Sequence, residues 1–88
     1  MGKIYALNDL PNNGDQSREA DFRAKISFAE DPHSGFLRPG QKGKMSSEHI
    51  KAGNDYTVEA QVKINVHRDM HVAIDNVKQD QTVVIRYD

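Results

Sequence analysis

Histidine is the residue type in this sequence best suited to metal binding or acid–base chemistry, and there are four: His33, His49, His67 and His71. His67 and His71 are separated by three residues, a spacing that aligns two metal ligands on one face of a helix. The segment around them instead alternates like a strand, a turn and a second strand, so the two imidazoles would have to meet across a hairpin. No cysteine is present to complete a zinc site. We therefore predict solvent-exposed histidines, no metal and no other cofactor.

Nucleophilic catalysis has one candidate, the pair Ser46 and Ser47 close to His49. A catalytic serine needs a base and an orienting carboxylate that converge in space, and sequence proximity alone does not supply them. The GxxxxGK[ST] pattern of a phosphate-binding loop is missing. Glu30 and Asp31 flank a turn, where solvated carboxylates are expected. The sequence therefore predicts a protein that is not an enzyme.

A binding surface has better candidates, in and around residues 29–43. Phe36 and Leu37 are apolar residues within a turn-rich segment, so they either cap one end of the core or form an exposed recognition tip. Arg38, Lys42 and Lys44 are the one local excess of positive charge in a chain with 12 basic and 13 acidic side chains. A dedicated nucleic-acid binder usually has a basic excess or stripe. We select as candidate binding residues Phe36, Leu37, Arg38, Lys42, Lys44, His67 and His71.

Length and composition limit the class of protein. With 88 residues the chain makes one domain, in which residues 1–19 form a short N-terminal strand and a mobile connector. The absence of cysteine favours a reducing, cytoplasmic setting. The first ten residues lack the apolar core of a secretory signal, and no window approaches the roughly 20 apolar residues of a membrane span. We expect no membrane association.

The elements that must position these residues are strands. Residues 55–67 alternate between apolar and polar side chains, with Tyr56, Val58, Ala60, Val62, Ile64 and Val66 on one side. Such a period of two predicts a half-buried strand. Residues 20–28 repeat the pattern, and we expect Phe22, Ile26 and Phe28 to be the main core side chains there.

Shorter strands are predicted at residues 3–7, 44–50, 70–75 and 82–87, the second of these with a single helical turn as the alternative. Residues 29–43 are punctuated by proline and glycine and are expected to be a long loop, with a type II turn at Pro39 and Gly40. Short strands between turn signals, with no convincing helix, indicate an all-β fold. We predict a small antiparallel six-stranded β-barrel.

From Glu19 onwards the order of features resembles the C-terminal β-barrel domain of elongation factor Tu. That family has an alternating strand, a loop ending in Gly-Tyr-Arg-Pro-Gln-Phe, a turn, a long apolar strand ending in Ile-His, a Phe-Ala-Ile strand and a closing strand. The corresponding segments here are residues 20–28, 35–41, 52–55, 56–67, 72–74 and 82–87. The family's Thr-rich segment, which helps hold transfer RNA, has no counterpart between Gly43 and Ile50. The resemblance thus implies a barrel that packs against a partner, without nucleotide hydrolysis.

Our functional expectation is a stand-alone, non-enzymatic binding module that takes a protein partner, as an adaptor, inhibitor or immunity-type protein does. The alternative is an RNA-binding accessory protein related to translation factors. It would contact phosphates through Arg38, Lys42, Lys44 and the hairpin between His67 and His71. A homodimer is a further possibility, because residues 82–87 form an apolar terminal strand whose edge can pair across a two-fold axis.

Overall fold

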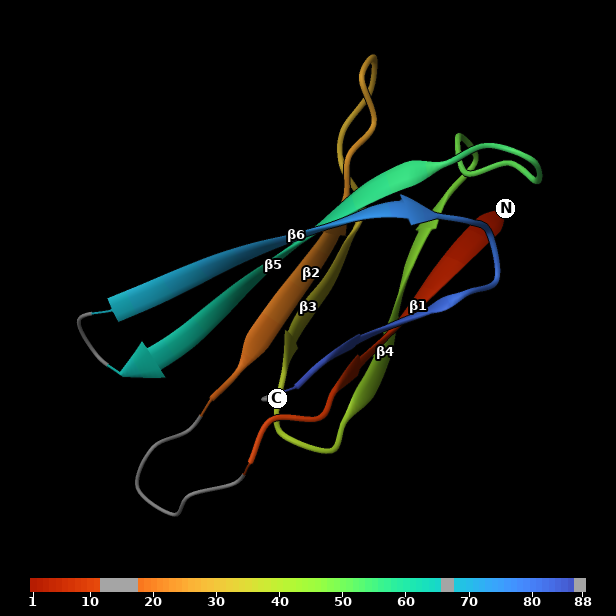
Figure 1. Ribbon diagram of the computed structural model, residues 1–88. Helices are drawn as coiled ribbons and strands as arrows, with labels where there is room; N and C mark the ends of the chain where they lie inside the picture. The colour runs from red at the N-terminus through yellow and green to blue at the C-terminus, as the bar shows by residue number, and fades with distance from the viewer. Residues whose placement is uncertain (12–17, 66–67, 87–88) are drawn as a thin grey trace.

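The computed structural model of the chain describes residues 1–11, 18–65 and 68–86, and in this part it consists of strands and turns without a helix (Figure 1). Two sheets pack face to face around one core. The described residues form seven strands: β1 (Gly2–Asn8), β2 (Ala20–Ala24), β3 (His33–Leu37), β4 (Lys42–Ser47), β5 (Tyr56–Asn65), β6 (Arg68–Val77) and β7 (Thr82–Ile85).

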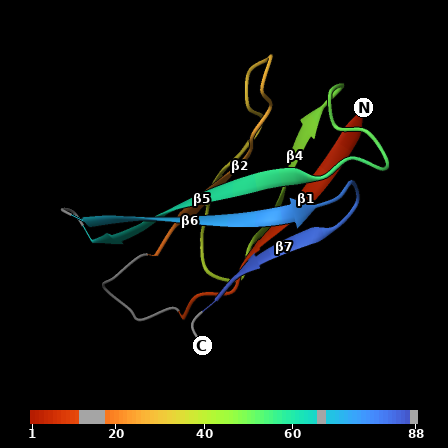
Figure 2. The same ribbon diagram turned by 45° about the horizontal axis from the view of Figure 1, so that its top comes forward.

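The strand order is β4-β1-β7 in the three-stranded sheet and β3-β2-β5-β6 in the four-stranded sheet (Figures 1 and 2). Neighbours are antiparallel except β1 and β7, which run parallel. The predicted all-β class is confirmed. The predicted closed barrel of six strands is not what forms: the seven described strands make two separate sheets, because no backbone ladder joins the outermost strands of one sheet to those of the other.

β5, one of the two central strands of the four-stranded sheet, has the most regular alternation of buried and outward side chains. Val58, Ala60 and Val62 of β5 are buried, while Glu59 and Gln61 between them lie on the outer face. β5 pairs with β2 on one side and with β6 on the other. Phe22 of β2 is fully buried beside them. The predicted strand at 55–67 is therefore confirmed over residues 56–65; Asp55 lies before it, and residues 66 and 67 lie outside the described residues.

A strand that the sequence hides is β3, which lies inside the predicted loop of residues 29–43. Its pairing with β2 shifts from Asp21 opposite Phe36 to Arg23 opposite His33. The extra residue makes a β-bulge, with Gly35 at φ 79° and the Phe22 N–H donating to Ser34 Oγ over 3.1 Å. An edge strand that contains a glycine bulge lacks the apolar alternation from which strands are recognised.

The prediction that Phe28 is a core residue is wrong, because its side chain is 75% exposed. β2 ends at Ala24, and the chain then turns back towards β3. The Ile26 N–H donates to Asp31 Oδ1 over 2.7 Å, which closes this loop, and Ile26 is buried as predicted. The alternation on which the prediction relied ends where the chain bends.

Two similar four-residue turns connect the four-stranded sheet to the three-stranded sheet. Residues 38–41 join β3 to β4, and residues 78–81 join β6 to β7. In the first, Arg38 O accepts from the Gln41 N–H, and Gly40 has the positive φ (87°) predicted for it. In the second, Lys78 O accepts from the Gln81 N–H, and Asp80 has φ 68°. Both turns also hydrogen-bond to β1. The predicted turn at Pro39 and Gly40 is present.

Candidate functional site

One side of the sandwich, between β3 and β4, is closed by side chains. Leu37 at the end of β3 is buried, and Gly43 of β4 lies against it. A Cβ atom on Gly43 would come within 2.9 Å of Leu37 Cδ2, so glycine allows the two strands to approach this closely. The turn of residues 38–41 holds their ends together. We call this the closed side.

A fully buried asparagine secures the closed side. Asn8 Nδ2 donates to Arg18 O and to Leu37 O, each over 2.8 Å, and Asn8 Oδ1 accepts from the Leu10 N–H over 3.0 Å. The Asn8 carbonyl also accepts from the Gly40 N–H over 2.6 Å. A buried amide is stable only when its polar atoms are hydrogen-bonded, and here each one has a partner. Asn8 therefore links β1, β3 and the turn after β3.

The opposite side, between β6 and β7, is open. Each of these strands pairs along one edge, β6 with β5 and β7 with β1, and among the described residues no ladder joins the two. Figure 2 shows β6 and β7 diverging from the turn that connects them. Each strand thus has one edge of backbone N–H and C=O groups without a strand partner in the described structure.

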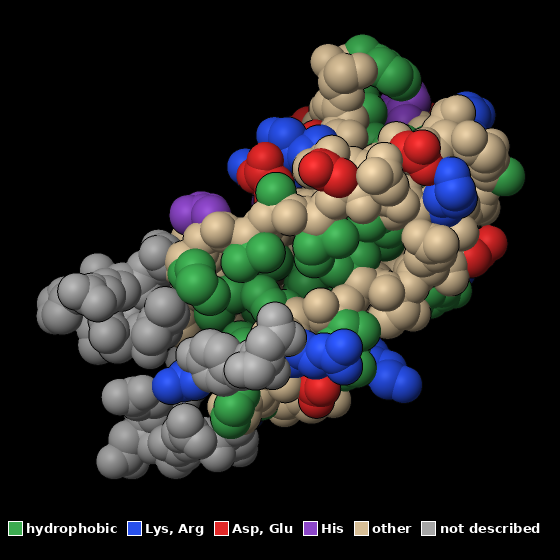
Figure 3. Space-filling model, viewed as in Figure 1, with side chains coloured by type: hydrophobic (Ala, Val, Ile, Leu, Met, Phe, Trp, Pro, Cys, Tyr) green, Lys and Arg blue, Asp and Glu red, His purple; other side chains and the backbone are tan. Residues whose placement is uncertain are grey.

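An apolar groove of about 260 Å³ runs between the diverging strands. Figure 3 shows hydrophobic side chains gathered along this side of the molecule. The residues that line the groove are Leu10, Met70, Val72, Ile74, Val84, Ile85 and Arg86. Three of them, on β6, are only partly buried against the core, and Val84 is 39% exposed. The volume lies below the roughly 300–1,000 Å³ typical of small-molecule pockets.

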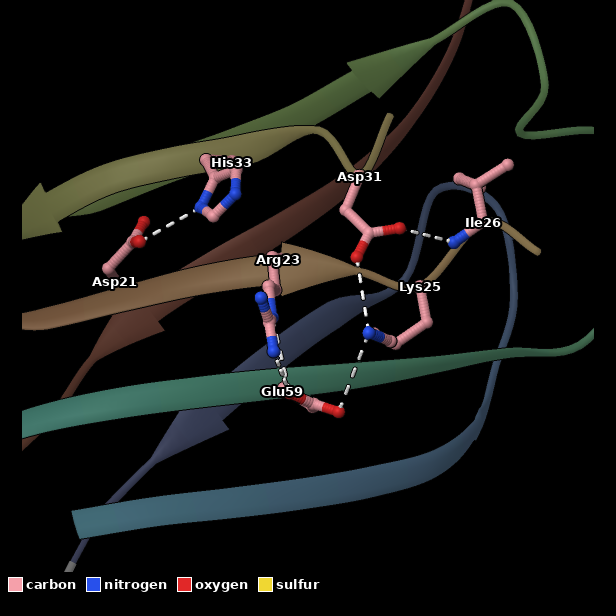
Figure 4. Close-up of polar contacts among 7 residues, drawn as sticks. All are labelled: Asp21, Arg23, Lys25, Ile26, Asp31, His33 and Glu59. Atoms are coloured by element: carbon pink, nitrogen blue, oxygen red, sulfur yellow. Dashed lines mark hydrogen bonds and ion pairs between the residues drawn. The ribbon is translucent and has the colours of Figure 1, made fainter. Parts of the chain in front are cut away.

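The outer face of the four-stranded sheet carries charges that neutralise one another (Figure 4). Arg23 Nη2 lies 2.6 Å from Glu59 Oε2, Lys25 Nζ lies 3.3 Å from Asp31 Oδ2, and His33 Nδ1 lies 2.9 Å from Asp21 Oδ2. These charges come from neighbouring strands and from the loop between β2 and β3.

The ion pairs shift the pKa values of three groups. The hydrogen bond with Arg23 lowers the pKa of Glu59, and the same bond raises the pKa of Arg23. The hydrogen bond from the Ile26 N–H is the main cause that lowers the pKa of Asp31, and the neighbouring Lys25 lowers this pKa further. Each shift favours the charged form, so all three groups remain ionised at neutral pH. None of them is tuned towards neutral pH, as a general acid or base would be.

A small polar pocket of about 70 Å³ lies on the same outer face, lined by Asp21, Arg23, His33, Glu59, Gln61 and His71. Most of its charged groups already pair with one another. In the described part of the chain, no three histidine or carboxylate side chains come together as a metal site requires. The serine pair considered for catalysis has a structural contact instead: Ser47 Oγ accepts from the His49 N–H over 3.1 Å.

The predicted binding residues do not form one surface. Leu37 is buried in the core, as the capping interpretation has it, so it is not available to a partner. Phe36 lies on β3 with Lys63 Nζ 4.1 Å from the centre of its ring. Arg38 is exposed in the turn after β3, and His71 is exposed on β6.

The remaining predicted residues are Lys42, Lys44 and His67. The two lysines are exposed on β4, in the other sheet from Phe36 and His71. His67, and with it the hairpin of His67 and His71, lies outside the described residues. The groove was not predicted as a site. In the sequence, the alternation of Met70, Val72 and Ile74 indicates an apolar face of a strand. It does not indicate that no other described strand packs along the outer edge of β6.

Comparison with known proteins adds no relative: no family model, no curated protein and no solved structure matches the chain. Within the described residues, the structure has no helix that is long and apolar enough to cross a lipid bilayer.

Proposed function

We propose that this protein is a non-enzymatic binding module that docks a protein partner in the groove between β6 and β7. The observation that carries the proposal is an apolar groove bordered by two strand edges that lack a ladder partner among the described residues. Natural proteins usually protect such edges with charges, proline or a covering element. β7, with the sequence Thr-Val-Val-Ile, has neither a charge nor a proline.

The energetic argument rests on surface that the fold leaves partly exposed. Met70, Val72 and Ile74 pack against the core but remain only partly buried. Covering apolar surface stabilises a complex by roughly 25 cal/mol per Å². A partner that also satisfies the backbone groups of an edge gains directional hydrogen bonds, as in β-strand addition. Both contributions are available at this groove.

The occupant that fits is an extended polypeptide segment. β6 and β7 follow each other through a tight turn and run in opposite directions, so an inserted strand would be antiparallel to one and parallel to the other. Its apolar side chains should recur at every second position, matching Met70, Val72 and Ile74. Arg86 is the one charged residue in the described lining, so a carboxylate on the segment at that end would complement it.

The sequence resemblance to the C-terminal domain of elongation factor Tu implies a domain that packs against a partner, although the described strands form two separate sheets and not the barrel of that family. We keep that resemblance as a proposal, together with the expectation that the protein has no catalytic role. A homodimer formed through the edge of β7 is the alternative use of the same surface.

The test is affinity capture of partners from the native lysate, with nuclease present, using matched variants. Val84→Glu places a carboxylate on the wall of the groove, whereas Ala73→Glu adds the same charge on the exposed opposite side of β6. We expect a protein captured by the wild type and by Ala73→Glu to be lost, by tenfold or more, with Val84→Glu. Equal capture by all three proteins would refute the groove as the docking site.

Sedimentation equilibrium separates the homodimer from a foreign partner. A wild-type dimer that Val84→Glu converts to a monomer would show that a second copy of the chain occupies the groove. A monomeric wild-type protein would show that a second copy does not occupy the groove, so the proposed partner would be a different protein.

A further inference from the structure

A second surface, on the outer face of the three-stranded sheet, is basic. Lys3 and Tyr5 on β1 and Lys42 and Lys44 on β4 lie on this face. The residues that alternate with them are buried or, in the case of Gly43, lie against the buried Leu37. The register places Tyr5 opposite Lys44 and Leu7 opposite Lys42. We call Lys3, Tyr5, Leu7, Lys42 and Lys44 the basic face.

The charge of the basic face is not neutralised within the described structure. None of its three lysines lies within ion-pair distance of a described carboxylate, in contrast to Arg23 and Lys25 on the other sheet. The outward positions of β1 and β4 hold no acidic residue; the first ones, Asp9 and Glu48, come after the strand ends. In a chain of formal net charge −1, three positive charges therefore gather on one face.

An aromatic ring lies among these cations. Tyr5 is 39% exposed on the central strand of the sheet, with Lys44 opposite it on β4 and Lys3 two positions away on the same strand. Side chains two apart on a strand are separated by about 6.8 Å. Proteins that bind single strands combine cations that follow the phosphate backbone with aromatic rings on which bases stack. An acidic peptide would use the lysines but would offer no planar group to the ring.

We propose that the basic face binds single-stranded nucleic acid, with phosphates on Lys3, Lys42 and Lys44 and one base stacked on Tyr5. Lys3, Tyr5, Lys42 and Lys44 do not line the groove between β6 and β7, although Leu7 of the basic face pairs with the groove residue Val84. The two proposals are therefore tested with different variants. The five residues of the basic face include no guanidinium or side-chain amide, the groups that make most bidentate contacts with base edges, so we expect binding that is independent of sequence. A duplex keeps its bases stacked on one another and gains only the electrostatic part of the interaction.

The salt dependence follows from the number of phosphates. Each phosphate contact to a single strand contributes about −0.7 to the slope of log K against log salt concentration. Three contacts give a slope of about −2. Replacing one lysine by glutamine should reduce this slope to about −1.4, whereas replacing Tyr5 should weaken binding without changing the slope.

The experiment is fluorescence anisotropy with a labelled 12-nucleotide oligouridylate at 20–200 mM salt. We expect Lys44→Gln to lower affinity and slope together. Tyr5→Ala should lower affinity about fivefold or more, because stacking of one base contributes about 1–3 kcal/mol. Tyr5→Phe keeps the ring and should bind like the wild type. Lys51→Gln removes an exposed lysine from the loop after β4, outside the basic face, and should also bind normally.

Three results would overturn the proposal. The first is no binding at 20 mM salt. The second is an equal loss of affinity with Lys51→Gln and Lys44→Gln, which indicates non-specific attraction. The third is binding of polyglutamate as tight as that of the oligonucleotide, with Tyr5→Ala unaffected, which makes the ligand an acidic polypeptide. Circular dichroism of each variant checks that the sheet signal is retained.

Discussion

The closed side and the open side of this sandwich begin from almost the same turn. Residues 38–41 and 78–81 each span four residues, and each ends in a glutamine whose Oε1 accepts from the N–H of the turn's first residue. The third residue of each has positive φ and donates its N–H to a β1 carbonyl, Gly40 to Asn8 and Asp80 to Lys3. Yet β3 and β4 are held together and β6 and β7 diverge.

The difference lies in the side chains that meet beyond each turn. On the closed side Leu37 is buried against Gly43, and Asn8 hydrogen-bonds across the gap. On the open side Val84 stays exposed, and among the described residues no buried polar side chain bridges the two strands. A turn therefore brings two strands near each other, but packing and buried hydrogen bonds decide whether the sheets close.

The strongest test of this comparison removes apolar volume on each side. Leu37→Ala should lower the free energy of unfolding by about 2–5 kcal/mol, because it leaves a cavity in the core. Val84→Ala on the open side should change it by no more than about 1 kcal/mol, since that side chain is already partly in water. Urea denaturation of both variants measures the difference. Equal losses would show that the open side contributes as much as the closed side.

A second test removes the amide that links the closed side. Asn8→Ala leaves the Leu37 carbonyl and the Leu10 N–H without their partner. Each buried group left unpaired costs about 1–3 kcal/mol, so we expect a loss of about 2–4 kcal/mol in urea denaturation. Asn54→Ala, at an exposed position, is the control and should stay within about 0.5 kcal/mol of the wild type. A small effect of Asn8→Ala would mean that packing alone closes this side.

The smallest expected effect concerns the loop between β2 and β3, where Asp31 holds the chain as it turns. Its pKa is lowered in the folded state, first by the Ile26 N–H. Its stabilising contribution is therefore present above an ordinary pKa of about 4 and is lost as the pH falls through the lowered folded pKa. Glu59 acts in the same direction.

Asp31→Asn keeps an acceptor for Ile26 but removes the charge. We expect a loss of less than about 1 kcal/mol at pH 7 and a smaller fall in Tm between pH 7 and pH 3 than in the wild type. Glu30→Gln, the exposed neighbour in the same loop, should leave the pH profile unchanged. Identical profiles for Asp31→Asn and the wild type would contradict this role of Asp31. Thermal unfolding followed by circular dichroism at several pH values makes the measurement.

Strands with strict alternation were predictable from the sequence. Phe22, Val58, Ala60 and Val62 are buried as their period of two requires. The failures occur where the pattern is interrupted. Phe28 continues an apparent alternation past the end of β2, and β3 is concealed by its glycine bulge. In both cases hydrogen bonds to residues several positions away determine where the chain turns.

The candidate sites were less predictable than the strands. Lys42 and Lys44 stood out as a local charge excess, but their neighbours Lys3 and Tyr5 come from a strand some 40 residues earlier and become neighbours through the register of β1 with β4. In the same way, a strand was predicted at residues 70–75, where Met70, Val72 and Ile74 alternate with polar or small residues. The alternation does not indicate that the outer edge of this strand has no strand partner among the described residues.

Local periodicity is sufficient for the strands, because neighbouring side chains on an extended backbone alternate whatever the rest of the chain does. The residue types of the local sequence also indicate the turn at Gly40, since glycine readily adopts a positive φ. Which edges pair, which side closes and which cations meet on one face depend on contacts between distant segments. Those contacts are decided by side-chain volume and buried hydrogen bonds, as Leu37, Gly43 and Asn8 show, and only the folded structure brings them together.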